Sequence, residues 1–140
     1  MKIFLSGSMA FAKEMLKVHK ELEEQGHTAE VPYGTEDHIN DPAFVEDLDG
    51  NIAYCIKHDV MRKCFQRVAD CDGILVLNYK RKGIDGYIGI SALMELGVAH
   101  FLKKKIFILY PIPDFSEHRW AHEVTIMQPV ILHGDLSQMA

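Results

Sequence analysis

The sequence predicts an α/β fold, in which a five-stranded parallel sheet carries helices on both faces. Short apolar runs alternate with longer segments of helical periodicity along the whole chain, which is the pattern of strand–helix repeats. The run GILVLNY at 73–79 is continuously apolar over its first five residues, which is typical of a strand buried on both faces. The length of 140 residues suits one such unit, so we expect a single domain over residues 1–140.

The composition limits the partners that we expect. It is 48% hydrophobic and 25% charged, which is ordinary for a globular protein. The net charge of −5 argues against binding to a nucleic acid polymer, and charged residues interrupt every apolar run, so we expect no membrane association. The three cysteines, Cys55, Cys64 and Cys71, include no CxxC pair, which favours a reducing, cytoplasmic location.

The first half of the chain is predicted to contain two strands, one helix and a loop. Residues 2–6 (KIFLS) form a short apolar run that we interpret as a core strand rather than a signal peptide. Apolar residues at helical spacing predict a helix over 10–26, which ends at a glycine. A short strand is predicted at 27–32, and the acidic, turn-rich segment 33–51 is predicted to be a loop.

The second half alternates helix and strand three times. Its helices show 3.6-residue periodicity, and its strands are short apolar runs, one of them ended by prolines. The predicted helices are 52–70, 91–104 and 115–127, and the predicted strands are 73–79, 105–113 and 129–135.

Five strands in a chain of this length suit the order 2-1-3-4-5 of a flavodoxin-like or Rossmann-like three-layer sandwich. In such sheets the ligand lies beyond the carboxyl ends of the strands, near the point between strands one and three where the order reverses. This rule selects three loops for a binding site: 6–9, 78–91 and 111–115.

Glu95 is the residue near these loops whose position most needs an explanation, because its neighbours Met94 and Leu96 are apolar. We expect its helix to start near Ser91, a good N-cap residue, with Glu95 in the first turn. An acid at that place is stabilised by the helix dipole, so a structural role is one interpretation. A capping acid usually lies on a polar face, however, whereas an ionised and poorly solvated carboxylate suits a nucleophile.

The segment around Glu95, GYIGISALMELGVAHFLKKKIFILYPIP, resembles the nucleoside 2-deoxyribosyltransferase superfamily, which includes the 2'-deoxynucleoside 5'-phosphate N-hydrolases. The matching motif is E-x-G-x-A, here Glu95, Gly97 and Ala99, followed by Lys105-Ile106 before an apolar strand. The opening KIFLSGSM also resembles the first strand and Gly-Ser loop of that family, and VADCDGILVL extends the resemblance over most of the chain.

The resemblance implies cleavage or transfer at the N-glycosidic bond of a (deoxy)nucleoside or nucleoside 5'-monophosphate, with Glu95 as the nucleophile and a glycosyl-enzyme intermediate. It also implies a second acid that protonates the leaving base. Asp59 is our candidate because of its position on the predicted helix. At a rise of about 1.5 Å per helical residue, it lies about 16 Å from Asp70 along the helix axis, which places it near the ligand edge. Asp72 is expected at the opposite edge, in a structural role.

Residues of the selected loops are candidates for substrate binding. The Gly-Ser loop precedes a helix, so its backbone N–H groups can hold a phosphate or a sugar hydroxyl, although a plain tight turn is the alternative. The basic triplet at 80–82 favours a 5'-phosphate, with a solvated loop as the alternative, and Tyr87 either stacks on a base or covers the core. The candidates are Ser6, Gly7, Ser8, Met9, Asn78, Lys80, Arg81, Lys82, Asp85, Tyr87, Gly89 and Ser91.

No metal site and no cofactor are expected. His118 and His122 are four residues apart but lack the glutamate of H-E-x-x-H. The transferases commonly carry an aspartate and a glycine where this chain has Gly89 and Ser91, which leaves open a non-catalytic nucleotide-binding or sensing domain of the same fold. A response-regulator-like module is the third alternative, but Asn78 stands where it would need a phosphoacceptor aspartate.

The expected partners are a small-molecule nucleoside or nucleotide and further copies of the chain. The resemblance implies that a neighbouring subunit helps to complete the site. The apolar content of 100–102 and 120–127 independently indicates a homo-oligomer, a dimer or higher.

Overall fold

The computed structural model describes residues 1–139, and its centre is a parallel sheet in the order β2-β1-β3-β4-β5. This confirms the predicted order and the predicted α/β class. β1 lies between β2 and β3, and its last residue, Ser6, is paired with Val76 of β3. The strands are β1 (Lys2–Ser6), β2 (Thr28–Glu30), β3 (Gly73–Val76), β4 (Lys105–Ile108) and β5 (Val130–Ile131).

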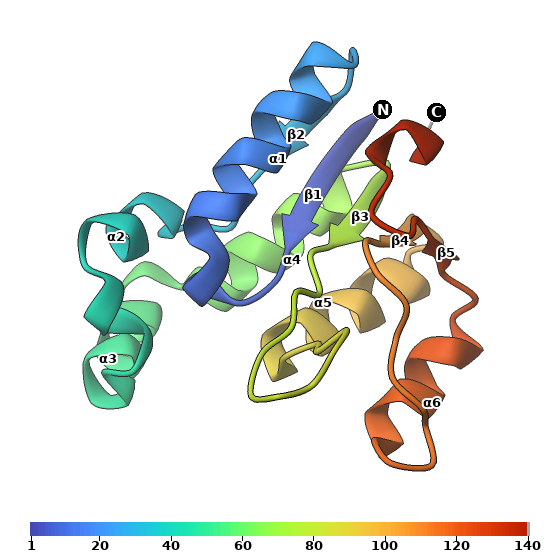
Figure 1. Cartoon of the computed structure of the whole chain (residues 1–140). Coiled ribbons are helices and arrows are strands. Elements are labelled where there is room, and N and C mark those ends of the chain that lie inside the picture. The colour runs from blue at the N-terminus through green and yellow to red at the C-terminus, as the bar shows by residue number, and fades with distance from the viewer. Residues whose placement is uncertain (140) are drawn as a thin grey trace.

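Six α-helices and three short 3-10 helices connect and cover these strands (Figure 1). The α-helices are α1 (Ala12–Glu24), α2 (Thr35–Asn40), α3 (Leu48–His58), α4 (Val60–Asp70), α5 (Ile90–Phe101) and α6 (Arg119–Ile126). The 3-10 helices are η1 (Met9–Phe11), η2 (Pro42–Val45) and η3 (Leu136–Met139). None of the helices in the described residues combines the length and the apolar character needed to cross a membrane.

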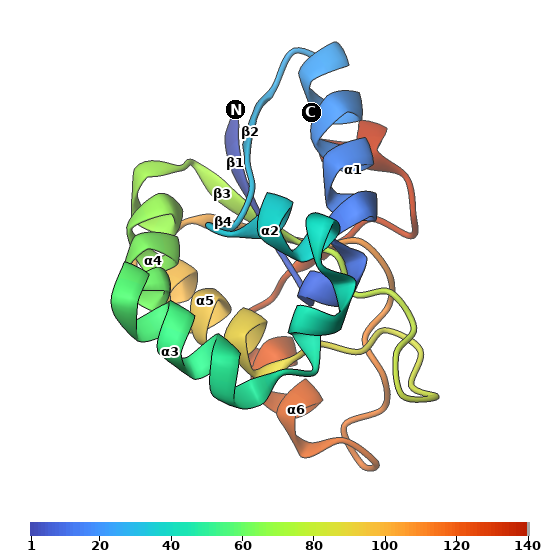
Figure 2. The same ribbon diagram turned by 90° about the vertical axis from the view of Figure 1, so that its left-hand side faces the viewer.

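Successive residues of the central strands point to opposite faces of the sheet, and both faces are buried. Leu5 packs in one apolar cluster with Met15 of α1. Phe4 packs in a second cluster with Val68 of α4 and Leu96 of α5. Figure 2 shows the resulting layers, with α1 on one side of the sheet and α4 and α5 on the other. Burial on both faces is the reason why the strands appear in the sequence as continuous apolar runs.

The prediction of a loop over 33–51 is wrong, because this segment contains α2, η2 and the start of α3. One of its polar residues caps a helix: the Asp47 carboxylate accepts a hydrogen bond of 3.0 Å from Gly50 N at the start of α3. Phe44 packs edge-on against Tyr54, with ring centroids 5.4 Å apart. The acidic residues that indicate a loop in the sequence are here the residues that begin helices.

The prediction of one helix over 52–70 is also wrong, because α3 and α4 are separate helices that meet at Asp59. Asp59 has φ 49° and ψ 48°, in the left-handed region, and this conformation ends α3 and begins α4. Aspartate is among the few residues that adopt it at low cost. The apolar periodicity of the sequence continues across Asp59, so the sequence pattern does not reveal that α3 ends there.

The remaining elements are confirmed, with shorter bounds than predicted. The last strands are shortened most, since β4 ends at Ile108 and β5 at Ile131, before the predicted ends at 113 and 135. The helix predicted over 115–127 begins only at Arg119, because the residues before it form a turn in which the Asp114 carboxylate accepts a hydrogen bond of 2.8 Å from Ser116 N.

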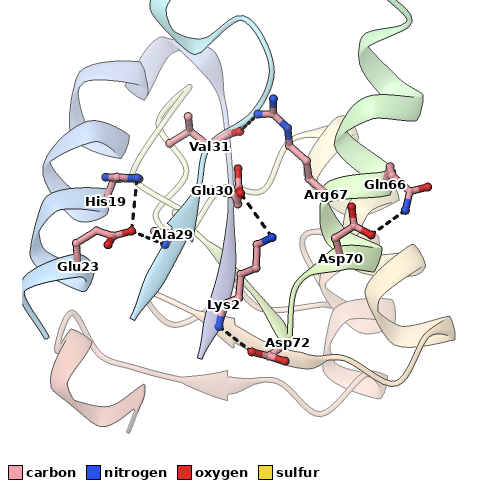
Figure 3. Close-up of polar contacts among 10 residues, drawn as sticks. All are labelled: Lys2, His19, Glu23, Ala29, Glu30, Val31, Gln66, Arg67, Asp70 and Asp72. Carbon is pink, nitrogen blue, oxygen red and sulfur yellow. Dashed lines mark hydrogen bonds and ion pairs between the residues drawn. The ribbon is translucent and has the colours of Figure 1, made fainter. Parts of the chain in front are cut away.

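The edge of the sheet opposite the expected ligand edge is held by polar contacts (Figure 3). Lys2 N, at the start of β1, donates a hydrogen bond of 2.7 Å to the Asp72 carboxylate just before β3. At the other end of the strands, just after β2, the Arg67 guanidinium donates to the carbonyl oxygen of Val31. Asp72 therefore lies at the edge predicted for it and joins two neighbouring strands.

Candidate active site

Glu95 projects from α5 toward the sheet and is only 6% exposed. α5 starts at Ile90 after Gly89, with no side-chain cap, so the expectation that Ser91 caps the helix is wrong. Glu95 is the sixth helical residue and lies in the second turn rather than the first. The helix dipole acts mainly within the first turn, so it does not account for an acid at this position.

Ser6 is the direct partner of Glu95. Its Oγ donates a hydrogen bond of 2.6 Å to Oε1 of Glu95, and both side chains are buried. Ser6 is the last residue of β1, so the bond places Glu95 at the carboxyl end of the central strands. This is the edge at which open parallel sheets bind their ligands.

Burial raises the pKa of Glu95 to about 7, and the hydrogen bond from Ser6 opposes this rise. The carboxyl group therefore titrates near neutral pH. Within residues 1–139, no group donates a hydrogen bond to Oε2 of Glu95. Every fully buried side-chain N or O atom in these residues does have a hydrogen-bond partner. Because Oε2 has none, it is not fully buried and keeps contact with solvent. One oxygen is thus fixed by Ser6, while the other has no partner within the protein.

Cys64 of α4 is a neighbour of Glu95 that the sequence did not single out. It is buried, and burial together with the charge of Glu95 raises the pKa of its thiol to about 11. The thiol is therefore protonated at neutral pH and adds no charge beside the carboxylate.

The loop after β1 needs its glycine for packing. A Cβ atom at Gly7 would lie 3.1 Å from the carbonyl oxygen of Leu77 and 3.2 Å from the methyl group of Met15. The next residue, Ser8, caps η1, and its Oγ accepts a hydrogen bond of 3.2 Å from Ala10 N.

Arg81 is the member of the basic triplet that reaches this loop. It donates a hydrogen bond to Ser8 Oγ and pairs with Glu46 at 3.3 Å, and its side chain is 23% exposed. A two-residue turn places it there, with Lys82 and Gly83 both at positive φ and paired backbone hydrogen bonds between Arg81 and Ile84. Glu46 was not expected in the site, because it belongs to the segment predicted to be a loop.

The structure does not bring the other two basic residues to the Gly-Ser loop. Lys80 pairs with Asp85 at 3.8 Å, and both side chains are largely exposed. Lys82 lies over the ring of Tyr87, with its ammonium nitrogen 5.8 Å from the ring centroid.

Asn78, a predicted binding residue, is buried and held by the protein itself. Its amide donates to the carbonyl oxygen of Tyr110 at 2.8 Å and to that of Gly86 at 3.4 Å, and its carbonyl oxygen accepts from Tyr110 N at 2.8 Å. These bonds tie the end of β3 to the end of β4 and to the loop before α5. Asn78 therefore shapes the edge of the site.

Three of the candidate residues remain to be placed. Met9 begins η1, and its sulfur accepts a long contact of 4.0 Å from Thr35 Oγ1. Gly89 precedes α5 beside Tyr87, since a Cβ atom there would lie 3.7 Å from the Tyr87 ring. Ser91 is exposed on the first turn of α5.

Asp59, the predicted proton donor, lies at the junction of α3 and α4. Its carboxylate is 58% exposed and accepts a hydrogen bond of 2.9 Å from Arg62. Among the described residues its contacts do not include Glu95, so its predicted role stays a prediction.

Two cavities in the described residues lie away from Glu95. One, of about 480 Å³, lies at the opposite edge of the sheet and is lined by residues such as His100, Lys103 and Gln128. The other, of about 210 Å³, is lined by residues of η1, α1 and α2, among them Met9 and His38. Within residues 1–139, no group of three or more histidine, cysteine, aspartate or glutamate side chains is placed to hold a metal ion.

Comparison with known proteins gives little further information. No protein-family model and no curated protein matches the chain. Among solved structures, the chain is similar to the Clostridium botulinum CMP N-glycosidase BcmB, with 17% identity and a TM-score of 0.45. The similarity covers 94% of this chain and 85% of that one. A likeness at this level says nothing about the chemistry of this chain.

Proposed function

We propose that this chain cleaves or transfers at the N-glycosidic bond of a (deoxy)nucleoside or nucleoside 5'-monophosphate, with Glu95 as the nucleophile. The observation that carries the proposal is the state of Glu95. It is a buried carboxyl at the ligand edge of the sheet, with Oε1 held by Ser6 and Oε2 open to solvent. A buried carboxyl with a purely structural role ordinarily has both oxygens held by protein donors.

In the proposed reaction, Oε2 of ionised Glu95 attacks the anomeric carbon as the bond to the base breaks. The bonding electrons leave with the base, which takes up a proton, and a glycosyl ester of Glu95 remains. Water or a second base then displaces Glu95, so the configuration at the anomeric carbon is retained. A carboxylate close to the sugar also stabilises the oxocarbenium character of the transition state.

The proposal assigns the proton for the leaving base to Asp59, on the ground of its place at the start of α4. In the free protein Asp59 is paired with Arg62 at the surface, so this role requires the ion pair to open when substrate binds. The proposal assigns the 5'-phosphate to Ser8 and Arg81. An arginine donating to a loop hydroxyl can redirect its remaining N–H groups to a phosphate.

The test is base release by wild type and Glu95→Gln from a panel of nucleosides and 5'-monophosphates. Glutamine keeps the shape of the side chain and accepts the hydrogen bond from Ser6, but it cannot form the glycosyl ester. We expect base release to be lost while ligand binding, measured by calorimetry, is kept. A 2-fluoro sugar substrate should give a glycosyl adduct by mass spectrometry in the wild type alone. Wild-type turnover by Glu95→Gln would contradict the mechanism.

A non-catalytic nucleotide-binding or sensing domain is the second candidate. It is favoured by the contacts of Arg81, which joins Ser8 to Glu46 and so holds the loop after β1 against the segment before α3. Binding of a 5'-monophosphate without release of base, on the same panel, would select this candidate.

A further inference from the structure

A cavity of about 480 Å³ lies where α5 and α6 both end and where β4 and β5 both begin. Its wall carries His100 and three consecutive lysines, Lys103, Lys104 and Lys105, and none of the described residues that line it is an aspartate or a glutamate. The whole chain has 20 acidic residues against 15 lysines and arginines, so a wall with only basic charges departs from the overall balance. A cavity of this size is large enough for a small molecule.

The cavity is separate from the candidate active site. Lys105 begins β4, and through Gly73 it is in register with Ile3 of β1. Ser6, which holds Glu95, lies further along β1, about 10 Å from Ile3 at about 3.3 Å per residue. Neither Ser6 nor Glu95 lines the cavity, so a ligand there meets a different set of side chains.

No carboxylate within residues 1–139 neutralises the three lysines. None of them forms an ion pair in this part of the chain, and the Nζ atom of Lys105 donates to the thioether sulfur of Met1, at 3.6 Å. Asp72 accepts a backbone hydrogen bond from Lys105, but its carboxylate is bonded to Lys2 N instead. Adjacent like charges repel one another, and a bound anion removes this cost.

The lysines are not needed to cap α5 either, although basic residues often interact with the last carbonyl groups of a helix. The carbonyl oxygen of Ala99 accepts a backbone hydrogen bond of 2.9 Å from Lys104 N. That of His100 accepts one of 3.1 Å from Lys103 N. The dipoles of the two helices that end here contribute about one negative charge together, against the three positive charges of the lysines. The field in the cavity therefore favours an anion.

Two residues of the cavity wall hold a backbone conformation that glycine adopts at lower cost. Lys103 follows α5 with φ 56°, and Gln128 follows α6 with φ 54°. They are two of the five non-glycine residues at positive φ within residues 1–139. Glycine is the usual residue at this position after a helix. A lysine and a glutamine are kept there in spite of the backbone cost, and both line the cavity, which indicates a use for their side chains.

We propose that this cavity binds a phosphorylated small molecule. The ammonium groups of the lysines and the side-chain amide of Gln128 donate hydrogen bonds to the phosphate oxygens. A phosphate monoester carries about two negative charges near neutral pH, so three clustered ammonium groups favour it over a carboxylate. Met127 and Val130, on the same wall, give an apolar surface for the body of the molecule. The proposal does not depend on the reaction proposed for Glu95.

The first test is an NMR titration with phenyl phosphate, which joins a phosphate to an apolar ring, and with inorganic phosphate. We expect the amide signals of residues 103–105 to shift with both, in the wild type and equally in Arg81→Ala. Phenyl phosphate should bind about three- to tenfold more tightly than inorganic phosphate, because its ring covers apolar surface. Shifts confined to residues 6–9 and Arg81, or no shifts at all, would overturn the proposal.

The second test replaces the three lysines of the cavity together with glutamine. Binding of phenyl phosphate should weaken at least about tenfold, because the charge-assisted contacts are lost. The matched control combines Lys17→Gln, Lys20→Gln and Lys57→Gln, which removes the same charge from exposed positions on α1 and α3, and it should keep the wild-type affinity. Circular dichroism checks that both variants are folded. Equal weakening in the two variants would indicate general charge attraction and overturn the proposed site.

The third test asks whether the left-handed lysine serves the ligand. Lys103→Gly should weaken the binding of phenyl phosphate about threefold, while the denaturation temperature should not fall, because glycine relieves the left-handed conformation. Lys82→Gly is the matched control, since Lys82 also has positive φ, at 53°, but lies in the loop after β3. It should leave the affinity unchanged. Wild-type affinity in Lys103→Gly would contradict the proposal.

The source of the phosphate is tested by competition. A single-stranded oligonucleotide and vesicles that contain phosphatidic acid are each added at the same phosphate concentration as phenyl phosphate. We expect neither to displace phenyl phosphate, because the net charge of −5 repels an extended polyanion or an anionic surface. Displacement by either one, lost when the three lysines are replaced, would assign the cavity to that partner and overturn the small-molecule proposal.

Discussion

The hydrogen bond of 2.6 Å between Ser6 and Glu95 joins residues that are 89 positions apart in the chain. It connects the end of β1 to the second turn of α5, and both residues are buried. A hydroxyl that donates to a carboxylate favours the ionised form, whereas burial disfavours it. The balance of these two effects, a pKa of about 7 for Glu95, determines when the proposed nucleophile is ionised.

Removing the hydroxyl in Ser6→Ala should raise the pKa of Glu95 further, because the bond that lowers it is lost. In the proposed mechanism base release requires ionised Glu95, so the acid limb of kcat/KM against pH should move to higher pH. The profile of kcat/KM from pH 5 to 9 measures this shift. Ser8→Ala is the control, since Ser8 contacts Ala10 and Arg81, and it should leave the acid limb in place. An unmoved limb in Ser6→Ala would separate Ser6 from the ionisation of Glu95.

The stability of the protein should depend on pH through Glu95. The folded pKa of about 7 lies above the ordinary value of 4.5, so the folded state holds this proton more tightly than the unfolded state. The resulting stability is present below pH 4.5 and is lost as the pH rises to 7. Glu95→Gln cannot lose a proton. At pH 8 it should therefore be more stable than the wild type by about 1 to 3 kcal/mol, with a smaller difference at pH 5.

Urea unfolding of both proteins at pH 5 and pH 8 measures this difference. Glu117→Gln, at an exposed acid outside the site, is the control and should show no such pH-dependent gain. A gain for Glu95→Gln that is the same at both pH values would mean that the ionisation of Glu95 does not limit stability.

Arg81 should discriminate monophosphates from nucleosides. Arg81→Ala removes the proposed charge-assisted contact to the 5'-phosphate, so binding of the monophosphate should weaken about 10- to 100-fold, and binding of the nucleoside should change little. Lys80→Ala removes a charge from the same loop, but Lys80 is paired with Asp85 away from Ser8, so its effect should be small. Titration calorimetry with both ligands compares the variants. Equal weakening for the two ligands would remove Arg81 from the phosphate site.

Asp59→Asn tests the proposed proton donor without disturbing the backbone, because asparagine also adopts the left-handed conformation. Base release from an ordinary nucleoside should fall about 100-fold. Release of 7-methylguanine should not fall, because this base leaves without a proton. Arg62→Gln removes only the partner of Asp59 and should remain active. If Asp59→Asn releases both bases at the wild-type rate, the proton comes from another group.

The layers of the fold follow from local patterns, and these were predictable. The strands β1, β3 and β4 are buried on both faces, so their apolar runs identify them, and the alternation with helices predicts that the sheet is parallel. Glu95 was also identifiable, because a single acid among apolar residues is unusual. The division between α3 and α4 was not predictable, since it depends on one left-handed residue, Asp59, within an uninterrupted periodic pattern.

The polar contacts of the site were the least predictable part. The pairing of Arg81 with Ser8 and Glu46 joins three segments that are distant in sequence, and no local pattern encodes it. The start of α5 was misplaced because Gly89 precedes the helix without a side-chain cap, while the nearby Ser91 has the residue type that caps prefer.

The hydrogen bonds of Asn78 have a consequence for how this edge of the protein can change. They fasten the chain at position 78 and again at Gly86, so the segment between them is a closed loop with both ends fixed. Its tip, at Lys82 and Gly83, points into open space. Residues inserted at the tip would lengthen a loop whose ends are already held, at a small entropic cost, and would leave α5 and Glu95 in place. The tip is therefore the natural position for a graft or a reporter peptide, and the place where length can vary without moving the carboxylate.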